Sequence, residues 1–359
     1  MSAPGTALSF VEDIEDSLLQ VPNGVNAYRV CLAFEEDAEA KGAIQDVVHA
    51  RVLGCLIVHT PAGSVAALQE VVKEIQARDR DFDALSALGE SFVDWFIRPF
   101  RKFRLKTIYP SNQPSPPDSQ TQEVPKTPFW KAKEQALLRD SSKCIVTGKF
   151  DIEAAMEAGL AFDDNVLKKG GGTTARCGYI VPDPNHLKLH SNIIKNDSDD
   201  RSNPAPAEPV VFAFLKQLGY DVDNWDLKGD RVNSLPNVMT LEKDVLYWFD
   251  RLKVWFEKTS TPNSYSVKSL VPIGIPDSVA FTSSDPITLP LPSEKLLALH
   301  AICANVSHLS GATQLLDQLD RDAENLHSEV LASDGTSSGV LNHALWNRLG
   351  SAGCGIKGA

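Results

Sequence analysis

The sequence predicts a mainly helical α+β fold. Apolar residues recur at helical spacing over residues 38–53 and 65–78, as is typical of amphipathic helices. Residues 242–256 are expected to form a further helix that is apolar on more than one face. Two short segments rich in β-branched or apolar residues, 143–147 and 176–181, indicate strands. Because the expected helices are longer and more numerous than the strands, helices should dominate the fold.

Residues 1–109 are expected to form a helical N-terminal region in which nothing points to catalysis. Its helices include 83–96, and Ser64 is a suitable N-cap for the helix that follows it. Residues 54–60 fit either an extension of the preceding helix or a short buried strand. Residues 110–128 are rich in Pro, Ser, Gln and Thr, and this composition cannot bury enough apolar surface to offset the entropy of ordering. They are predicted to be a flexible linker.

Two parts follow the linker. Residues 129–275 contain the two strand segments, a long helix and polar insertions, and they are expected to form a second domain. Residues 276–359 are expected to form a C-terminal helical region. Its helices are predicted over 294–309, where Ser293 is a suitable N-cap, and over 313–329.

The net charge of the chain is −12. This argues against a general nucleic-acid binder, because phosphate neutralisation by Lys and Arg supplies most of such a protein's affinity. One local basic segment is the exception, and its charges alternate with Phe and Tyr. It fits either a strip that follows a phosphate backbone while its rings stack on bases, or an amphipathic segment with buried rings and solvated charges. The five basic residues of this segment are Arg98, Arg101, Lys102, Arg104 and Lys106.

The cysteines and the apolar runs bear on the compartment. The six cysteines are scattered and form no Cys-x-x-Cys pair, so neither a zinc ribbon nor a dense disulfide framework is indicated. The N-terminus shows no basic segment followed by an apolar core, and no apolar run approaches the ~20 residues of a membrane span. We expect an intracellular protein, cytoplasmic or nuclear, with reduced and mostly buried thiols. No cofactor is implied.

Three short motifs carry the clearest relationship of this sequence. They are Cys-Ile-Val-Thr-Gly at 144–148, Gly-Tyr-Ile-Val-Pro at 178–182 and Asn-Val-Met-Thr-Leu at 237–241, the last followed by Phe249 and Asp250. In this order and spacing they resemble the HNH (His-Me finger, ββα) domain of a set of fungal proteins. The resemblance implies a central ββα (HNH-like) finger with insertions and with flanking helices on both sides.

The chain departs from the motifs of that family at the positions that carry its chemistry. The family's middle motif reads Ala-His-Ile-Ile-Pro, and its last motif contains Leu-His-x-x-Phe-Asp. Tyr179 and Leu246 occupy the two His positions, Gly178 precedes Tyr179, and Asn237 alone matches the three motif letters. The resemblance implies that Asn237 braces the finger by hydrogen bonds to its own loop.

These replacements bear directly on hydrolysis. In the family, a His on the strand acts as the general base that activates water, and a neighbouring residue or the later His holds a divalent metal. A general base needs a pKa near the working pH, and the ordinary pKa of Tyr, about 10, lies far above it. Neither Gly178 nor Leu246 has a group that binds metal. The sequence therefore predicts loss of metal-dependent hydrolysis at this finger.

Two histidines after the middle motif support a different hypothesis. His186 and His190 stand at i and i+4, which places both on one face if the segment is helical. A metal site would need a third ligand, for which Asp183 or one of three later aspartates is suitable. The alternative is a polar loop with two solvated histidines.

Three functional hypotheses follow. The first is an HNH-like protein with a degenerate site that acts as a binding or regulatory module for a protein partner or a small apolar ligand. The second is an enzyme of different chemistry, in which Tyr179, Leu246, Tyr247 and Trp248 line an aromatic cleft for a small organic molecule. The third is a metal-dependent nuclease. The candidate site residues across these hypotheses are Tyr179, Asp183, His186, His190, Asn237 and Asp250.

Overall fold

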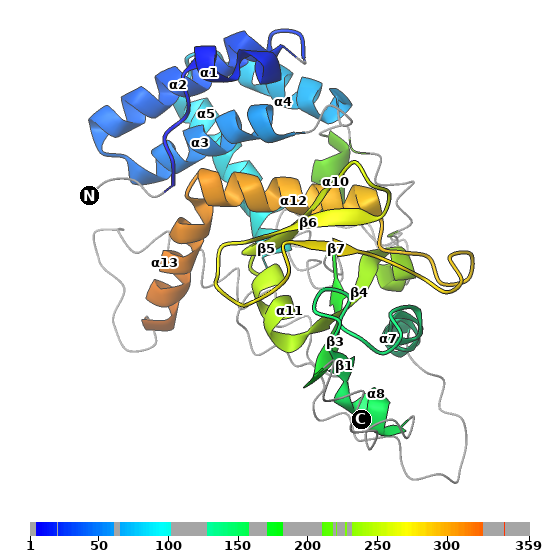
Figure 1. The fold of residues 1–359 in the computed structure, drawn as a ribbon. Helices are drawn as coiled ribbons and strands as arrows, with labels where there is room; N and C mark the ends of the chain where they lie inside the picture. The colour runs from blue at the N-terminus through cyan, green and yellow to red at the C-terminus, as the bar shows by residue number, and fades with distance from the viewer. Residues whose placement is uncertain are drawn as a thin grey trace, which may run out of the picture.

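The structure is a computed structural model of the 359-residue chain. It describes residues 5–19, 21–60, 65–101, 128–157, 171–181, 210–217, 220, 227, 232–325 and 341. Helices dominate these residues and the sheets are small, which confirms the predicted α+β class (Figure 1).

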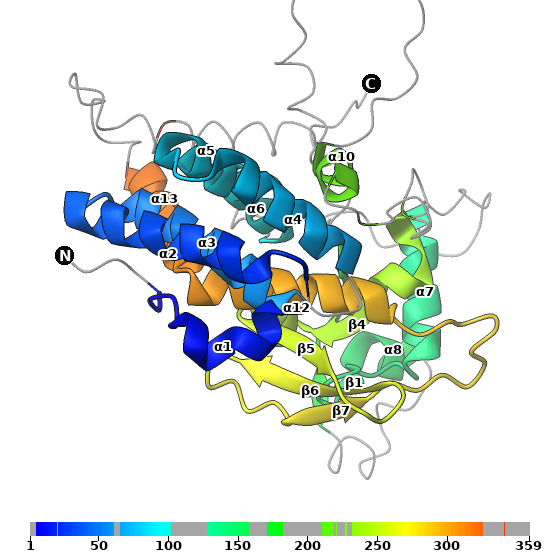
Figure 2. The ribbon, with the colours of Figure 1, turned by 90° about the horizontal axis from the view of Figure 1, so that it is seen from above.

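Five helices form the N-terminal layer. They are α1 (Val11–Leu18), α2 (Gly24–Lys41), α3 (Ile44–His59), α4 (Val65–Arg78) and α5 (Phe82–Phe92). Helices α2 and α3 run beside each other, with α4 and α5 packed against them (Figure 2). α3 is buried on most sides and continues to its last turn without a break. Residues 54–59 therefore extend the helix rather than forming a strand.

The last N-terminal helix changes its winding before it ends. After α5, a π-helical turn η2 (Val93–Ile97) leads into α6 (Arg98–Phe100). The rings of Phe96 and Phe100 are buried in the core and meet edge to face, with centroids 5.8 Å apart. The wider π-helical turn is consistent with the bulky aromatic side chains that enter the core here.

A ββα unit lies at the centre of the chain. β3 (Ala175–Tyr179) pairs with β4 (Val238–Glu242) in antiparallel register, and α11 (Lys243–Phe249) begins directly after β4. α7 (Pro128–Arg139) packs against both strands. A short 3-10 turn, η6 (Leu235–Asn237), leads into β4.

The segment before this unit differs from the prediction. Residues 143–147 were expected to form a strand, but Lys143 forms only an isolated β-bridge with Phe150, and residues 145–147 form a turn closed by the hydrogen bond from Gly148 N to Cys144 O, 2.9 Å. Thr147 N also lies 3.5 Å from Cys144 Sγ. The turn leads to β1 (Phe150–Asp151), which pairs in parallel with β2 (Gly172–Thr173). α8 (Ile152–Glu157) follows β1 directly.

The expected helix over 242–256 is wrong in its second half. α11 ends at Phe249, because Leu252 adopts a left-handed conformation with φ 58° and the backbone N–H groups of Arg251 and Lys253 both donate to Trp248 O. The chain then enters β5 (Val254–Lys258), whose β-branched and aromatic residues suit a strand.

β5 begins a three-stranded antiparallel sheet. β5 pairs with β6 (Ser264–Ser269), and β6 pairs with β7 (Ser278–Ala280). Residues 265–267 lie within β6, whereas residues 270–275, which follow it, belong to no strand. α10 (Val210–Gln217) lies apart from this sheet and contacts the π-helical turn.

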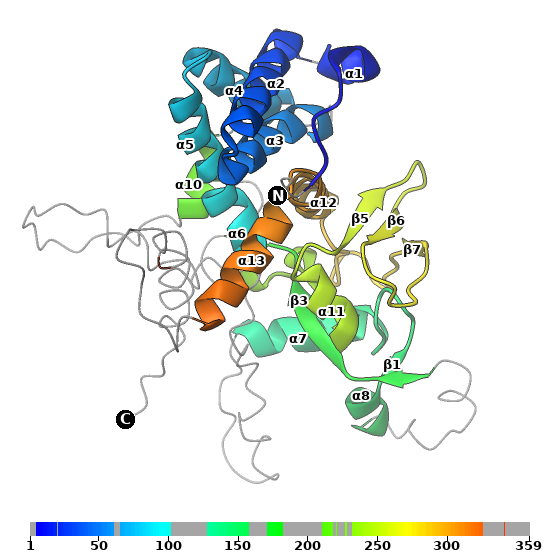
Figure 3. The same cartoon turned by 90° about the vertical axis from the view of Figure 1, so that its left-hand side faces the viewer.

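Two C-terminal helices complete the described fold. α12 (Glu294–Leu309) lies between the N-terminal helical layer and the β5–β7 sheet (Figure 3), and α13 (Ala312–Asn325) packs back against it. α12 is buried along most of its length because it contacts both α3 and β5. One continuous hydrophobic cluster therefore joins the N-terminal helices, α11, the sheet and α12.

Two expectations concern the thiols and the membrane. Within the described ranges, Cys31, Cys55, Cys144, Cys177 and Cys303 are buried thiols, as predicted. In the same part of the chain, none of the helices combines the length and apolarity that a bilayer crossing requires.

A polar contact between α3 and α5 accompanies a close helix crossing. Ser86 Oγ lies 2.5 Å from Asp46 Oδ1 and 3.0 Å from His49 Nδ1. The backbone of Gly89 lies so close that a Cβ there would be 2.5 Å from His49 Cβ. Burial lowers the pKa of His49 to about 4, against the opposing effect of the Asp46 and Asp94 carboxylates. His49 is therefore neutral at pH 7 in the folded protein.

This neutral histidine predicts a loss of stability in acid. The unfolded chain protonates His49 near its ordinary pKa of 6.5, whereas the folded chain does so only near pH 4. The unfolded state binds more protons between these values, so the free energy of unfolding falls as the pH drops, by up to about 3 kcal/mol from this group. Urea denaturation across this pH range measures the slope. His49→Gln should flatten it, and equal slopes in both proteins would contradict the assignment.

Candidate functional site

Asn237 braces the ββα unit from inside. Its side chain is fully buried. Oδ1 accepts a hydrogen bond from Val181 N at 2.8 Å, and Nδ2 donates to Val181 O at 2.9 Å and to Val232 O at 3.0 Å. The backbone adds a fourth bond, from Ile180 N to Asn237 O at 2.9 Å. These contacts tie the end of β3 to the start of β4, which is the bracing that the resemblance implied.

The space between β3 and α11 is filled by an apolar side chain. Gly178 faces α11, and a Cβ built on it would lie 2.6 Å from Leu246 Cδ1 and 3.4 Å from Leu241 Cδ1. Leu246 is 3% exposed. Leu246 stands at the position of a metal-binding His in the resembled family. Its side chain is packed against β3, where Gly178 leaves room for it.

Tyr179 lies on the opposite face of β3. Successive strand residues point to opposite faces, so Tyr179 turns away from the side on which Gly178 meets Leu246. Its ring joins a small cluster with Ala132 and Ala136 of α7. Its hydroxyl donates to Asn233 Oδ1 at 2.5 Å. The expectation of one aromatic cleft shared by Tyr179 and Leu246 is wrong, because the strand separates them.

The other two members of the expected cleft lie together at the end of α11. The rings of Tyr247 and Trp248 meet edge to face with centroids 4.7 Å apart. The Arg251 guanidinium stacks 3.6 Å above the Tyr247 ring, and Lys253 Nζ lies 5.5 Å from the Trp248 ring. The half-buried rings are thus engaged by cations of the turn that follows the helix.

Asp250 closes α11. It is 8% exposed, and its backbone N–H donates to Leu246 O at 2.9 Å. Next to it, His300 of α12 stacks on Phe249 with ring centroids 3.8 Å apart.

The remaining candidate residues cannot be placed. Asp183, His186 and His190 lie outside the described residues. Within the residues that are described, no group of three or more His, Cys, Asp and Glu side chains is arranged to hold a metal ion.

Two residues of the basic segment contradict the expectation that its charges are exposed. Arg98 is 7% exposed and its Nη2 lies 3.0 Å from Asp94 Oδ1. Arg101 is 4% exposed and pairs with Asp317 and, at 2.9 Å, with Asp320 of α13. Both guanidinium groups therefore form internal ion pairs and neither is available to a phosphate backbone. The alternative was right about the buried rings of Phe96 and Phe100 and wrong about solvated charges at Arg98 and Arg101.

Lys102, Arg104 and Lys106 complete the basic segment, and all three lie outside the described residues.

A buried ion pair that the sequence did not reveal supports the whole unit. The side chains of Arg139 and Asp140, at the end of α7, are 0% and 1% exposed. Arg139 Nε lies 2.7 Å from Asp140 Oδ1, and Nη2 lies 3.0 Å from Oδ2. Asp140 Oδ2 also accepts a bond from Thr240 N of β4 at 3.0 Å. The pair therefore fixes α7 to the middle of β4.

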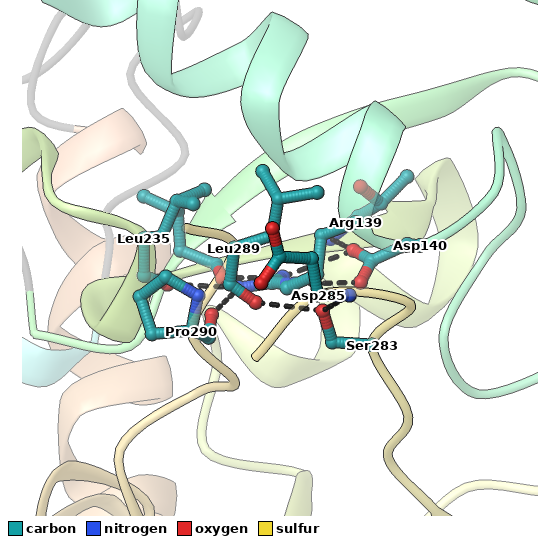
Figure 4. Close-up of polar contacts among 9 residues, drawn as sticks. Arg139, Asp140, Leu235, Ser283, Asp285, Leu289 and Pro290 are labelled. Carbon is teal, nitrogen blue, oxygen red and sulfur yellow. Dashed lines mark hydrogen bonds and ion pairs between the residues drawn. The ribbon is translucent and has the colours of Figure 1, made fainter. Parts of the chain in front are cut away.

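The same guanidinium also binds three backbone carbonyls (Figure 4). Arg139 donates to Leu235 O at 2.9 Å, to Val238 O at 2.9 Å and to Pro290 O at 3.2 Å. With the two bonds to the carboxylate, the five N–H groups of the side chain have five bonds. In sequence, an Arg-Asp pair at a helix end is typical of a solvent-exposed last turn, so no sequence signal distinguishes this buried pair.

Glu242 ties the turn after α7 to the end of β4. Its carboxylate accepts a bond from Thr147 Oγ1 at 3.0 Å and lies 3.1 Å from Lys149 Nζ. Another buried carboxylate, that of Asp151, accepts from Ala175 N at 2.7 Å. Two carboxylates thus hold this part of the chain together, that of Glu242 through the side chains of Thr147 and Lys149 and that of Asp151 through the backbone N–H of Ala175.

The contact between Gly178 and Leu246 predicts that substitutions at these two positions have strongly non-additive effects on the free energy of unfolding. Gly178→Ala should lower the free energy of unfolding by about 1–3 kcal/mol, the usual range for overpacking. Leu246→Ala should itself lower it by about 2–5 kcal/mol because it leaves a cavity. In the Leu246→Ala background, Gly178→Ala should be nearly neutral. A double-mutant cycle in denaturant measures this, and additive effects would show that the two positions do not meet.

The hydrogen-bond network of Arg139 predicts a large loss of stability when this residue is replaced. Arg139→Met keeps an unbranched stem but leaves the Asp140 carboxylate buried without its cation, so the free energy of unfolding should fall by about 3–5 kcal/mol. Lys131→Met places the same new side chain at an exposed position of α7 and should change it little. Denaturation of both variants decides the matter, and similar losses in the two would sink the proposed role of the pair.

No protein-family model, curated protein or solved structure matches this chain. The resemblance to the HNH finger accordingly rests on the three motifs alone.

Proposed function

We propose that this chain is an HNH-like ββα-finger protein with a degenerate site, acting as a binding or regulatory module rather than as an efficient nuclease. The observation that carries the proposal is the contact of Leu246 with Gly178. A Cβ at position 178 would lie 2.6 Å from Leu246 Cδ1, so the space for a strand side chain and a metal ligand is occupied.

The chemistry of phosphodiester hydrolysis supports the same conclusion. The reaction needs a base that activates water, together with a metal ion or cationic group that stabilises the developing charge. Tyr179 donates its hydroxyl hydrogen to Asn233 on the face of β3 away from Leu246. The two positions therefore do not converge on one reacting atom.

The buried hydrogen bonds around these positions are in place, which supports a finger that has been kept as a binding module. Asn237 makes three side-chain hydrogen bonds to backbone groups, and Arg139 makes three more besides its ion pair. A fold that keeps its buried polar supports while its reactive positions become apolar is suited to presenting a surface. A protein partner is favoured over nucleic acid, because the net charge is −12 and two of the five basic residues of the basic segment are consumed in internal ion pairs.

A divalent-metal titration tests the proposal against a nuclease built on His186 and His190. Thermal unfolding and plasmid cleavage are measured in the same tubes with Mg²⁺, Mn²⁺ or Zn²⁺. A metal at 100 times its Kd stabilises a folded protein by about 2.7 kcal/mol, which shifts Tm measurably. We expect no cleavage and no metal-dependent shift. Cleavage that disappears in His186→Ala or His190→Ala, together with a metal-dependent shift, would overturn the proposal.

A further inference from the structure

The N-terminus runs as a strap over the helical layer. Residues 5–9, here called the N-terminal strap, descend from α1 across α2 and α3 to the turn between α12 and α13 (Figure 1). The side view shows the same path (Figure 3). The strap forms no helix or strand of its own.

The first anchor of the strap is a backbone contact at the α12–α13 turn. Gly5 has φ 89°, and a Cβ there would lie 2.5 Å from Gly311 N and 2.6 Å from Leu309 O. Thr6 N donates to Leu309 O at 2.8 Å. Both the left-handed conformation and the close approach demand glycine at this position.

The second anchor uses a buried ion pair. Leu8 N donates to the Glu35 carboxylate of α2 at 3.1 Å, and Arg51 Nε of α3 lies 2.5 Å from the same carboxylate. The Leu8 side chain lies on Gly54, where a Cβ would be 2.7 Å from Leu8 Cδ2. Ser9 provides the third anchor, because its carbonyl accepts a bond from the Tyr28 hydroxyl at 3.0 Å.

Two thiols lie in the helical faces that the strap anchors to. Cys31 stands between Tyr28 and Glu35 at helical spacing on α2, and Cys55 follows Gly54 on α3. The exposed fractions of the two residues are 0% and 6%. Burial raises the pKa of Cys31, and raises the pKa of Cys55 to about 12, so both are unreactive thiols in the closed form.

The strap itself is weakly held compared with what it touches. Gly5, Thr6, Ala7 and Ser9 are exposed. The hydrogen bonds given above join it to the helices at one backbone atom each, whereas the helices beneath belong to the main hydrophobic cluster. Segments with few buried contacts open at lower free energy than the core they cover.

We propose that the N-terminal strap is a latch that opens as a unit before the protein unfolds, and that its opening gives solvent access to Cys31 and Cys55. The device makes two thiols available for modification only in the open state. It also releases the α12–α13 turn, so that anything binding residues 5–9 would act on the C-terminal helices. The proposal does not depend on the function of the ββα unit.

Thiol labelling of the full chain tests the latch. The protein is treated with N-ethylmaleimide under native conditions, and labelling of each cysteine is followed by peptide mass spectrometry. Cys303, which is 0% exposed in α12, serves as the internal reference for global unfolding. We expect Cys31 and Cys55 to react faster than Cys303. Hydrogen exchange at the amides of Thr6 and Leu8 should report the same opening.

Two variants should open the latch, and one matched control should leave it closed. Gly5→Ala forces a side chain into the left-handed region and into the α12–α13 turn, so labelling of Cys31 and Cys55 should rise about tenfold or more. Thr6→Pro removes the N–H that binds Leu309 and should act in the same direction. Gly274→Ala meets comparable backbone strain, φ 62°, with nothing within 4 Å, and should leave both rates unchanged.

The outcomes separate cleanly. Faster labelling of Cys31 and Cys55 in the two strap variants, with Cys303 unchanged, supports the latch. Equal rates for all three thiols in every protein, or equal effects of Gly5→Ala and Gly274→Ala, would show that these thiols are reached only by global unfolding and would overturn it.

Discussion

The ββα unit depends on one buried guanidinium. Arg139 is wholly removed from water, and a buried cation is tolerated only when its charge and all of its N–H groups are matched. The partners that satisfy it come from α7 itself, from the turn before β4, from β4 and from the segment that leads into α12. Their positions are therefore not independent. Asn237 lies directly before β4, so the position of its hydrogen bonds depends on the same buried guanidinium.

Within that framework, buried polar residues hold the backbone, while Leu246 fills a position at which the resembled family has a histidine. Asn237 and Asp151 bind backbone groups, and neither depends on a metal or a substrate for its partners. Leu246 instead contributes burial, which stabilises the folded chain at roughly 25 cal/mol per Å² of apolar surface. A metal site needs side chains with nitrogen, oxygen or sulfur donor atoms, so a packed leucine side chain and a bound metal ion exclude each other from this space. Arg98 and Arg101 likewise contribute to the fold, because both form ion pairs with carboxylates of the same chain.

Local sequence patterns correctly predicted the elements whose conformation is determined by neighbouring residues. The helix over 65–78 was found because its apolar stripe is continuous, and the bracing by Asn237 followed from the motif around it. The strand at 254–258 was missed because its residues suit either a buried helix or a strand, and only pairing with β6 decides. The turn at 145–147 was missed because the apolar and β-branched residues around it suit a strand, and the hydrogen bond from Gly148 N to Cys144 O that closes the turn is not visible in the sequence. Arg139 escaped notice because burial of a charge is a property of the assembled fold.

The chain between β6 and β7 carries a consequence for association between copies. Its alternate residues Val271, Ile273 and Ile275 pack toward the core as strand residues would, while the residues between them face solvent. A row of this kind would ordinarily offer free N–H groups to a neighbouring chain. Two of the outward positions are Pro272 and Pro276, which have no N–H to offer. These two prolines therefore remove two of the N–H groups through which a foreign strand could pair with this segment.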